Sequence, residues 1–529
     1  MKELPRGWSA VGIRELVGSG VFADGDWIES KDQDPRGDVR LIQLADVGVG
    51  RFVDKSARFL TSQKAEELGC TYLEQGDVLI SRMADPIGRA CIFPGDKRRC
   101  VTVVDVCIVR PEPERADRTW LMGAINSPDF RASIEVAASG TTRSRVSRGN
   151  LGVLPLPVPP LNEQRRIVAK LEALQTRSRR AREALDAVPP LLEKLRQSIL
   201  AAAFRGDLTK DWRAQQKDLE PAAELLKRIR SQRRQKWETT ELAKLKSKGK
   251  PHTDDKWRTK YKEPEPADVT GLHELPAGWC WATVDLVGDV LLGRRRSAEE
   301  YVVGKEGRVL RPYVRVANVK EDRLALEDVL EMPFNEKELA LYTLIPGDIV
   351  LSEGQSPELV GQSAIYHGGF EHLCIQATVH RFRAAEYATT SEFAQLVFLN
   401  HLHSGYFRAA ASLTTNIAHL TSERLKPLRF PLPPLAEQAE VVERARRLLT
   451  LLHSQIARLR DLRAAQGTLG DAILSKAFRG ELVPQDPNDG PAESILARAG
   501  STNGPTPTNG PPPKRGRPRA AQRAEQAND

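Results

Sequence analysis

Long apolar runs and paired cysteines are both missing from this sequence of 529 residues. No stretch approaches the roughly 18 apolar residues that a membrane-spanning helix needs, and the start, M-K-E-L-P, has no apolar signal-peptide region. The six cysteines include no C-x-x-C pair, which argues against a disulfide scaffold and a cysteine-based zinc site. We therefore expect a soluble, cytoplasmic protein with reduced thiols and no membrane partner.

The motifs of nucleotide and metal chemistry are absent as well. Gly304-Lys305 is followed by glutamate, so there is no G-x-x-x-x-G-K-S/T phosphate loop, and no G-x-G-x-x-G follows a strand. The proline pairs at 159–160 and 433–434 follow aliphatic residues, which excludes the D/N-P-P-aromatic loop of amino-methyltransferases. The nine histidines lack zinc-ligand spacing, and we interpret His401 and His403 as a surface or half-buried pair. These absences favour a binding protein over an enzyme.

Positive charge is present but local. Forty per cent of the residues are hydrophobic, enough for buried cores, and the length suggests about three or four structural units. The net charge is +9, and residues 205–262 alone hold 18 Lys and Arg against 9 Asp and Glu. This segment suits phosphate neutralisation on a nucleic acid, and it equally suits a solvated helix without a ligand.

The C-terminal tail has a different composition. From Gly500 onward it is rich in Pro, Gly, Ser, Thr and Asn, which cannot supply a buried face, so we predict disorder. Residues 515–518 read R-G-R-P and resemble the core of an AT-hook, which lays arginines along an A·T minor groove. A generic basic tail is the alternative interpretation.

The most informative feature of the sequence is an internal duplication. L-P-R-G-W at 4–8 recurs 271 residues later, and so does the L-x-x-G-D-V/I-hydrophobic run at 73–81. P-V-P-P-L-N-E-Q at 157–164 and A-F-R-G-D-L at 203–208 each recur 274 residues later. Four matches in the same order indicate two duplicated domains rather than a solenoid, whose repeats are shorter.

Each copy has a mixed α and β module of about 150 residues, followed by a long helical segment with a heptad seam. The first seam runs through Leu171, Leu174, Ser178, Ala181, Leu185, Val188, Leu192, Leu195 and Ile199. The second runs in the same register from Ala445 to Ile473. Two seams of equal length favour an antiparallel intramolecular coiled coil over packing of each seam on its own module. Pro189-Pro190 interrupt the first seam, and we predict a kink or break there.

The two P-L/V-P-P-L-x-E-Q and A-F-R-G-D/E-L boxes, with R-P-Y-V-R-V-A-N-V at 311–319, carry a family resemblance. Over about residues 4–496 the chain resembles the specificity subunit of type I restriction-modification enzymes. The resemblance implies an α+β fold: two mixed target-recognition domains separated by two long antiparallel helices that form an intramolecular coiled coil, related by a pseudo-two-fold axis.

The resemblance gives the following division of the chain: a first target-recognition domain at 1–158, a first spacer helix at 159–205, a basic helical linker at 206–272, a second target-recognition domain at 273–430, a second spacer helix at 431–482, and a C-terminal segment with a disordered basic tail at 483–529.

The resemblance also implies the function. Each target-recognition domain is expected to read one half of an asymmetric bipartite site in double-stranded DNA. The helices are expected to set the spacing and to dock two methylation subunits, which bring S-adenosylmethionine, while two restriction subunits bring ATP and Mg²⁺. The chain itself is expected to be non-catalytic, with no cofactor or metal. The boxes expected to contact partners supply Glu163, Gln164, Phe204, Arg205, Glu437, Gln438, Phe478 and Arg479.

Two loops are candidates for DNA contact because they precede the proline boxes and differ between the copies. The first reads G-T-T-R-S-R-V-S-R at 140–148 and the second S-L-T-T-N-I-A-H-L at 412–420. Different side chains read different base edges, so we expect unlike half-sites. The candidate residues are Thr142, Arg143, Arg145, Arg148, Thr415 and Asn416, with Arg294, Arg295 and Arg296 as a second cluster. Ordinary turns and solvent-facing arginines are the alternatives.

Two other functional classes stay open. A stand-alone architectural DNA-binding protein would bind tightly as a lone chain with little sequence preference. A nuclease or methyltransferase with an unrecognised site would be active alone with S-adenosylmethionine, or with magnesium and ATP.

Overall fold

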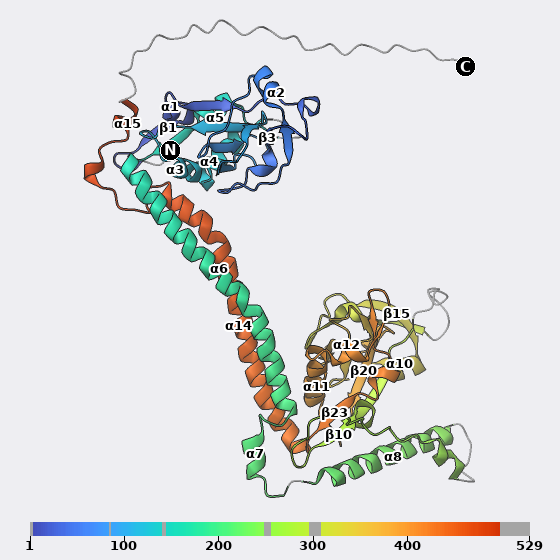
Figure 1. The fold of residues 1–529 in the computed structure, drawn as a ribbon. Helices are drawn as coiled ribbons and strands as arrows, with labels where there is room; N and C mark the ends of the chain where they lie inside the picture. The colour runs from blue at the N-terminus through green and yellow to red at the C-terminus, as the bar shows by residue number, and fades with distance from the viewer. Residues whose placement is uncertain are drawn as a thin grey trace, which may run out of the picture. The chain divides into compact units, whose positions relative to one another are not determined.

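The computed structural model describes residues 4–83, 86–139, 144–218, 220–247, 255–295 and 308–497 (Figure 1). The chain divides into two compact units, one formed by Met1–Glu183 with Leu462–Asp529 and the other by Ala184–Asp461. Within the described ranges, no helix combines the length and the apolar character that crossing a membrane requires. The R-G-R-P motif at 515–518 lies outside the described residues.

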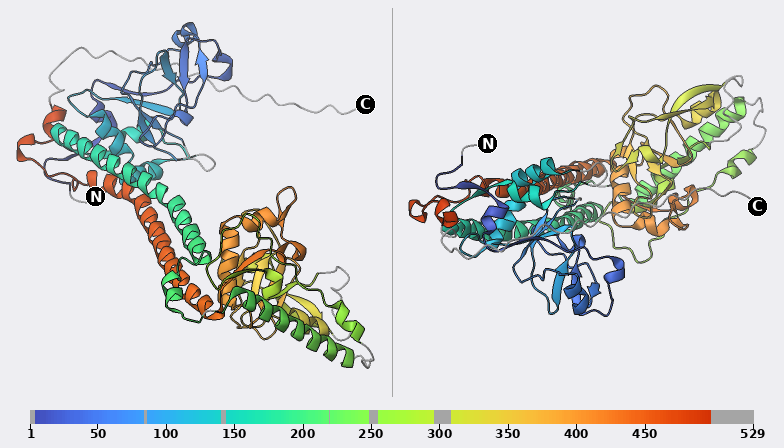
Figure 2. Two further views of the ribbon diagram at one scale, coloured as in Figure 1. Left: turned by 60° about the horizontal axis from the view of Figure 1, so that its bottom comes forward. Right: turned by 90° about the horizontal axis from the view of Figure 1, so that it is seen from above.

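Two long helices, α6 (Leu161–Phe204) and α14 (Leu435–Ala477), follow the two proline boxes and contribute to both units. In the first unit, Ile167 near the start of α6 shares a hydrophobic cluster with Ile473 near the end of α14. In the second unit, Leu200 near the end of α6 clusters with Val441 near the start of α14. The antiparallel pairing of the two seams is therefore confirmed, and both ribbon diagrams draw the helices side by side (Figures 1 and 2).

Of the kink or break predicted at Pro189-Pro190, the break is wrong, because α6 is one helix that contains both prolines. The kink stays a prediction. Each proline removes a backbone donor and crowds the preceding turn. Packing on α14 stabilises the helix on both sides of them: Ser178 accepts a 3.0 Å hydrogen bond from Gln466 at its backbone oxygen, and Ile199 lies in the core of the second unit. Tertiary packing supplies most of a helix's stability, so two missing hydrogen bonds do not end this one.

The seam itself is only partly as predicted. Leu452 and Leu459 are buried on α14, whereas Leu195, Leu462 and Leu469 are 49%, 56% and 41% exposed. A helix has 3.6 residues per turn, so a stripe of period 3.5 drifts around its surface and leaves the contact face.

The first module consists of short elements. Its strands are β1 (Ser9–Gly12), β2 (Val21–Asp24), β3 (Val39–Ile42), β4 (Arg58–Leu60), β5 (Val78–Ser81), β6 (Ala90–Ile92), β7 (Arg99–Thr102), β8 (Val106–Arg110) and β9 (Pro155–Val158). Its helices are α1 (Ile13–Val17), α2 (Ser62–Glu67), α3 (Arg118–Ile125), α4 (Pro128–Ala137) and α5 (Arg148–Val153). One sheet has the order β2-β8-β5-β6, a second has the order β4-β3-β7 with β3 and β7 parallel, and β1 pairs with β9.

The second module repeats this topology within its own unit. Its strands are β10 (Cys280–Thr283), β11 (Gly288–Leu292), β12 (Arg308–Val314), β13 (Val319–Lys320), β14 (Arg323–Leu324), β15 (Leu330–Asn335), β16 (Ile349–Ser352), β17 (Gly354–Gln355), β18 (Ser363–Ile365), β19 (Cys374–Ile375), β20 (Val379–Ala384), β21 (Ser412–Leu413), β22 (Ala418–His419) and β23 (Arg429–Leu432). Its helices are α9 (Val284–Val287), α10 (Glu336–Tyr342), α11 (Ser391–His403), α12 (Tyr406–Ala410) and α13 (Ser422–Leu425). The orders β11-β20-β16-β18 and β15-β12-β19, and the pair β10-β23, match those of the first module, so the duplication seen in the sequence is a duplication of structure.

The repeated Gly-Asp boxes build equivalent turns before β5 and β16. Gly76 and Gly347 have φ angles of 90° and 95°, a conformation that glycine adopts without steric cost. The following aspartates are buried and each is held by an arginine of the neighbouring strand: Arg110 Nε lies 2.6 Å from Asp77, and Arg383 Nε lies 2.6 Å from Asp348. These boxes therefore have a structural role.

Candidate nucleic-acid interface

The first candidate loop lies between α4 and α5. Thr142 and Arg143 lie outside the described residues. Arg145 forms backbone bridges to Met83 and to Ser139, and its side chain, 42% exposed, pairs with Asp105 at 3.0 Å.

Arg148 begins α5 beside this bridge. Its side chain is 41% exposed, and its Nε lies 3.8 Å from Asp24. Arg145 and Arg148 both line an open cavity of about 490 Å³, together with Arg14, Arg82, Ser139 and Ser147. The structure therefore brings two predicted arginines together at one cavity.

Arg82 was not predicted from the sequence, although it directly follows the repeated hydrophobic run at 73–81. It is 3% exposed, donates to the backbone oxygen of Val104 and pairs with Asp24 at 3.2 Å. It stabilises the floor of the cavity, while Arg145 and Arg148 keep exposed guanidinium groups.

The second module has an equivalent ribbon built from β17, β22 and β21. Thr415 and Asn416 are exposed in the turn between β21 and β22, which is closed by a 2.9 Å hydrogen bond from Thr414 N to Ile417 O. Both residues are therefore accessible to a ligand.

Backbone hydrogen bonds define which residues of the two ribbons correspond. Val146 N donates to Arg82 O at 3.0 Å, and Leu420 N donates to Glu353 O at 2.8 Å. Glu353 thus occupies the place of Arg82, and His419 the place of Arg145, with His419 Nδ1 3.4 Å from Glu353. At the same position one module presents arginines and the other an acid and an imidazole.

The arginines of the cluster at 294–296 differ in exposure. Arg294 is 5% exposed, pairs with Glu338 at 2.9 Å and lies 5.2 Å from the centre of the Phe334 ring. Its guanidinium therefore packs into the module. Arg295 is exposed, and Arg296 lies outside the described residues.

The glutamate-glutamine pairs of the proline boxes are buried at the base of each module. Trp8 Nε1 donates to Glu163 at 3.1 Å, and burial raises the pKa of Glu163. Thr209 Oγ1 donates to Glu437 at 2.7 Å. Gln164 and Gln438 each donate to a backbone oxygen of their own proline box at 3.0 Å. These side chains lock the module to its helix, which leaves them little surface for another polypeptide.

The A-F-R-G boxes pack on the module of the other copy. Phe204, at the end of the first long helix, packs edge-on against Phe393 of the second module at 5.8 Å. Phe478, at the end of the second, contacts Trp120 of the first module at 6.3 Å. The box that follows the first module in the sequence therefore packs on the second module, and the box that follows the second module packs on the first.

The arginines of these boxes remain at the surface. Arg205 pairs with Asp207 at 2.9 Å and Arg479 with Asp129 at 3.1 Å, and their side chains are 50% and 40% exposed. Of the predicted partner-contact residues, these two keep accessible charge.

The basic segment forms α7 (Lys210–Gln215), α8 (Ala222–Ser247) and a 3-10 helix over Asp255–Lys260. Leu225 and Ile229 of α8 are buried in the core of the second module. Several of its arginines are engaged in ion pairs, among them Arg228 with Glu220, Arg230 with Glu263, Arg233 with Asp285 and Arg234 with Glu238. This segment is thus packed against the module as well as charged.

Comparisons with known proteins agree with these features. Residues 5–184 match the type I restriction modification DNA specificity domain. The chain is 22% identical over 358 residues to the type I restriction enzyme EcoKI specificity subunit of Escherichia coli K12, covering 67% of this chain and 64% of that protein. It is 21% identical over 525 residues to the EcoEI specificity subunit of Escherichia coli, covering 90% of this chain and 83% of that one.

The fold is also similar to a solved structure. The crystal structure of the HsdS subunit from Thermoanaerobacter tengcongensis matches with a TM-score of 0.57 at 20% identity, covering 90% of this chain and 98% of that one. With the repeated boxes and the two paired helices, these matches show that residues 5–184 form a type I restriction modification DNA specificity domain and that the chain is similar to type I specificity subunits.

Proposed function

We propose that the two modules read the two unlike halves of a bipartite site in double-stranded DNA. The modules proposed for this role are the target-recognition domains at 1–158 and 273–430. The observation that carries the proposal is that Arg145, whose side chain is 42% exposed on the first ribbon, corresponds to His419 on the second. Arginine suits the acceptor edge of guanine, whereas the second ribbon offers an imidazole at the same place, so the two ribbons suit different bases.

The long helices are proposed to set the half-site spacing and to dock two methylation subunits. Five leucines on the two helices are exposed: Leu191, Leu195, Leu451, Leu462 and Leu469. Exposed apolar side chains on a helix suit contact with helices of another protein. Arg205 and Arg479, whose side chains are 50% and 40% exposed, are proposed to contact the same partners.

The chemistry of the complex is assigned to those partners. The methylation subunits are proposed to supply S-adenosylmethionine and to methylate adenine, and two restriction subunits to use ATP and Mg²⁺. The chain described here is proposed to act as the non-catalytic reader.

The test is to express the chain with its neighbouring methylation subunit and to map methylated adenines across a genome. A bipartite motif with two dissimilar halves is expected. Arg145→Ala should relax one half of the motif and His419→Ala the other, so each variant is the control for its partner. Removing one bidentate hydrogen-bonded pair with a base should cost about 1–3 kcal/mol of discrimination.

Two results would contradict the proposal. A continuous motif, or no motif despite an active methylation subunit, would contradict the claim that the two modules read two separate half-sites. If Arg143→Ala and Arg145→Ala change neither the affinity nor its salt dependence, the first loop does not contact DNA.

A further inference from the structure

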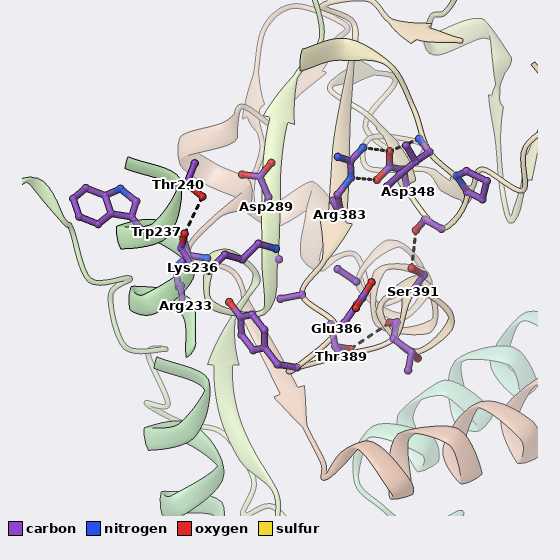
Figure 3. A pocket seen from close by; sticks show the side chains of 18 of the residues that line it. Arg233, Lys236, Trp237, Thr240, Asp289, Asp348, Arg383, Glu386, Thr389 and Ser391 are labelled. Atoms are coloured by element: carbon purple, nitrogen blue, oxygen red, sulfur yellow. Dashed lines mark hydrogen bonds and ion pairs between the residues drawn. The ribbon is translucent and has the colours of Figure 1, made fainter. Parts of the chain in front are cut away.

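A cavity of about 1020 Å³ lies between the basic segment and the second module (Figure 3). One wall comes from α8 and the residues after it: Arg233, Lys236, Trp237, Thr240, Lys260, Tyr261 and Lys262. The other wall comes from the turn before β16, the end of β20 and the start of α11, where Figure 3 labels Asp348, Arg383 and Ser391.

The charges on this cavity divide into engaged and available groups. Arg233 is paired with Asp285 at 3.1 Å and Arg383 with Asp348 at 2.6 Å. By contrast, the lining lysines Lys236, Lys260 and Lys262 are exposed and form no ion pair within the described part of the chain.

The acids on the cavity do not offset these lysines. Asp289 is paired with Arg381 at 2.7 Å, and Asp348 is held by Arg383. Glu386 is the one lining carboxylate without an ion pair among the described residues, so three available cations face one available acid. The cavity therefore has a surplus of positive charge that intramolecular pairs do not neutralise.

Aromatic stacking fixes where two of the lysines lie. Trp237 of α8 stacks on Trp257 with ring centres 5.9 Å apart and contacts Tyr261 at 5.2 Å. This cluster holds the segment around Lys260 and Lys262 against α8.

We propose that Lys236, Lys260 and Lys262 bind phosphates of the DNA backbone. The inference rests on the proposed function and adds to it a contact that carries no base information. Exposed lysines suit this role, because they neutralise phosphates as point charges and release condensed counterions. The salt dependence of DNA binding is therefore the property that these residues control.

The test compares two triple variants in the complex with the methylation subunit, on duplexes with the mapped motif and with a scrambled motif. Lys236→Gln, Lys260→Gln and Lys262→Gln together should weaken binding to both duplexes alike. The slope of log affinity against log salt should fall by up to about 0.9 for each phosphate that is no longer neutralised. The methylated motif should not change.

The control variant removes the same charge from the same segment. Lys210, Lys217 and Lys246 are exposed, form no ion pair within the described ranges and do not line the cavity. Changing these three to glutamine should leave the salt slope close to that of the unmodified chain. Glu386→Gln should act in the opposite direction and strengthen binding to both duplexes.

The outcomes separate the inference from the proposed function. If the unmodified complex binds its motif but the cavity variant keeps the full salt slope, or the control variant lowers the slope as much, the inference is overturned and the proposed function stands. If the unmodified complex shows no sequence preference, both are overturned. A nucleoside triphosphate is the second probe: binding that needs the three lysines, with an unchanged DNA salt slope, would assign the cavity to a free nucleotide instead.

Discussion

Truncating the phenylalanine of an A-F-R-G box should loosen the module of the opposite copy. Phe204 is 4% exposed and lies in the core cluster of the second module, with its ring 5.8 Å from Phe393. Phe→Ala changes at buried positions cost about 3–5 kcal/mol, because the truncation removes buried apolar area and leaves a cavity. Phe204→Ala should therefore destabilise the second module, although the residue ends the helix that follows the first.

Hydrogen exchange read by mass spectrometry resolves this effect by region. A destabilisation of about 3–5 kcal/mol lowers protection by roughly two to four orders of magnitude wherever exchange occurs by opening of that module. In Phe204→Ala, peptides covering β10, β23 and α11 should exchange faster, while those covering β1 and β9 should not change. Phe478→Ala is the matched control, because its ring contacts Trp120 and it should give the reverse pattern.

The reasoning would be refuted by faster exchange in the first module of Phe204→Ala with a protected second module. Equal effects of both variants on both modules would also contradict the reasoning, because each phenylalanine would then not stabilise one module alone.

Three further predictions concern single sites. Asp348→Ala should lower the free energy of unfolding by about 1–3 kcal/mol in urea titrations, because it removes the buried carboxylate that holds the Arg383 guanidinium, and no decrease would contradict the pair. Gly206→Ala should lower the melting temperature, because φ is 75° and a non-glycine residue there costs about 1–2 kcal/mol, whereas Gly467→Ala inside α14, with no atom within 4 Å of the added carbon, should raise it. Burial lowers the pKa of His403, but a 3.0 Å contact with the Glu321 carboxylate outweighs burial and sets the pKa above 6.5. This stabilisation is complete well below pH 6.5 and is lost as the pH rises through the raised pKa. His403→Gln should therefore flatten the decline in unfolding free energy above pH 6.5, and an unchanged decline would contradict the pairing.

Much of the architecture could be predicted because the signals are local or repeated. The 3-and-4 spacing of apolar residues predicted two long helices, and their equal length predicted their antiparallel pairing. Spacing could not predict that Leu195, Leu462 and Leu469 stay exposed, because that depends on how the contact stripe drifts around paired helices. It also could not predict that α6 continues through two prolines, since the stabilising contacts come from α14.

The candidate site divides in the same way. The loops at 140–148 and 412–420 could be found because they interrupt otherwise matching copies. The ion pair that buries Arg294 comes from Glu338, far along the chain, so three adjacent arginines looked alike in the sequence. Arg82 and Glu353 gained their significance only when backbone hydrogen bonds placed them at equivalent positions.

Two copies of one module and two helices with matching seams can be inferred from the sequence alone, because these properties depend on residues close together in the chain. Which A-F-R-G box packs on which module, and which lysines of the basic segment lack an ion pair, follow from the folded structure. The packing of the boxes and the pairing of the lysines both depend on contacts between segments that are distant in the chain. The local sequence of a box or of a lysine is compatible with more than one contact.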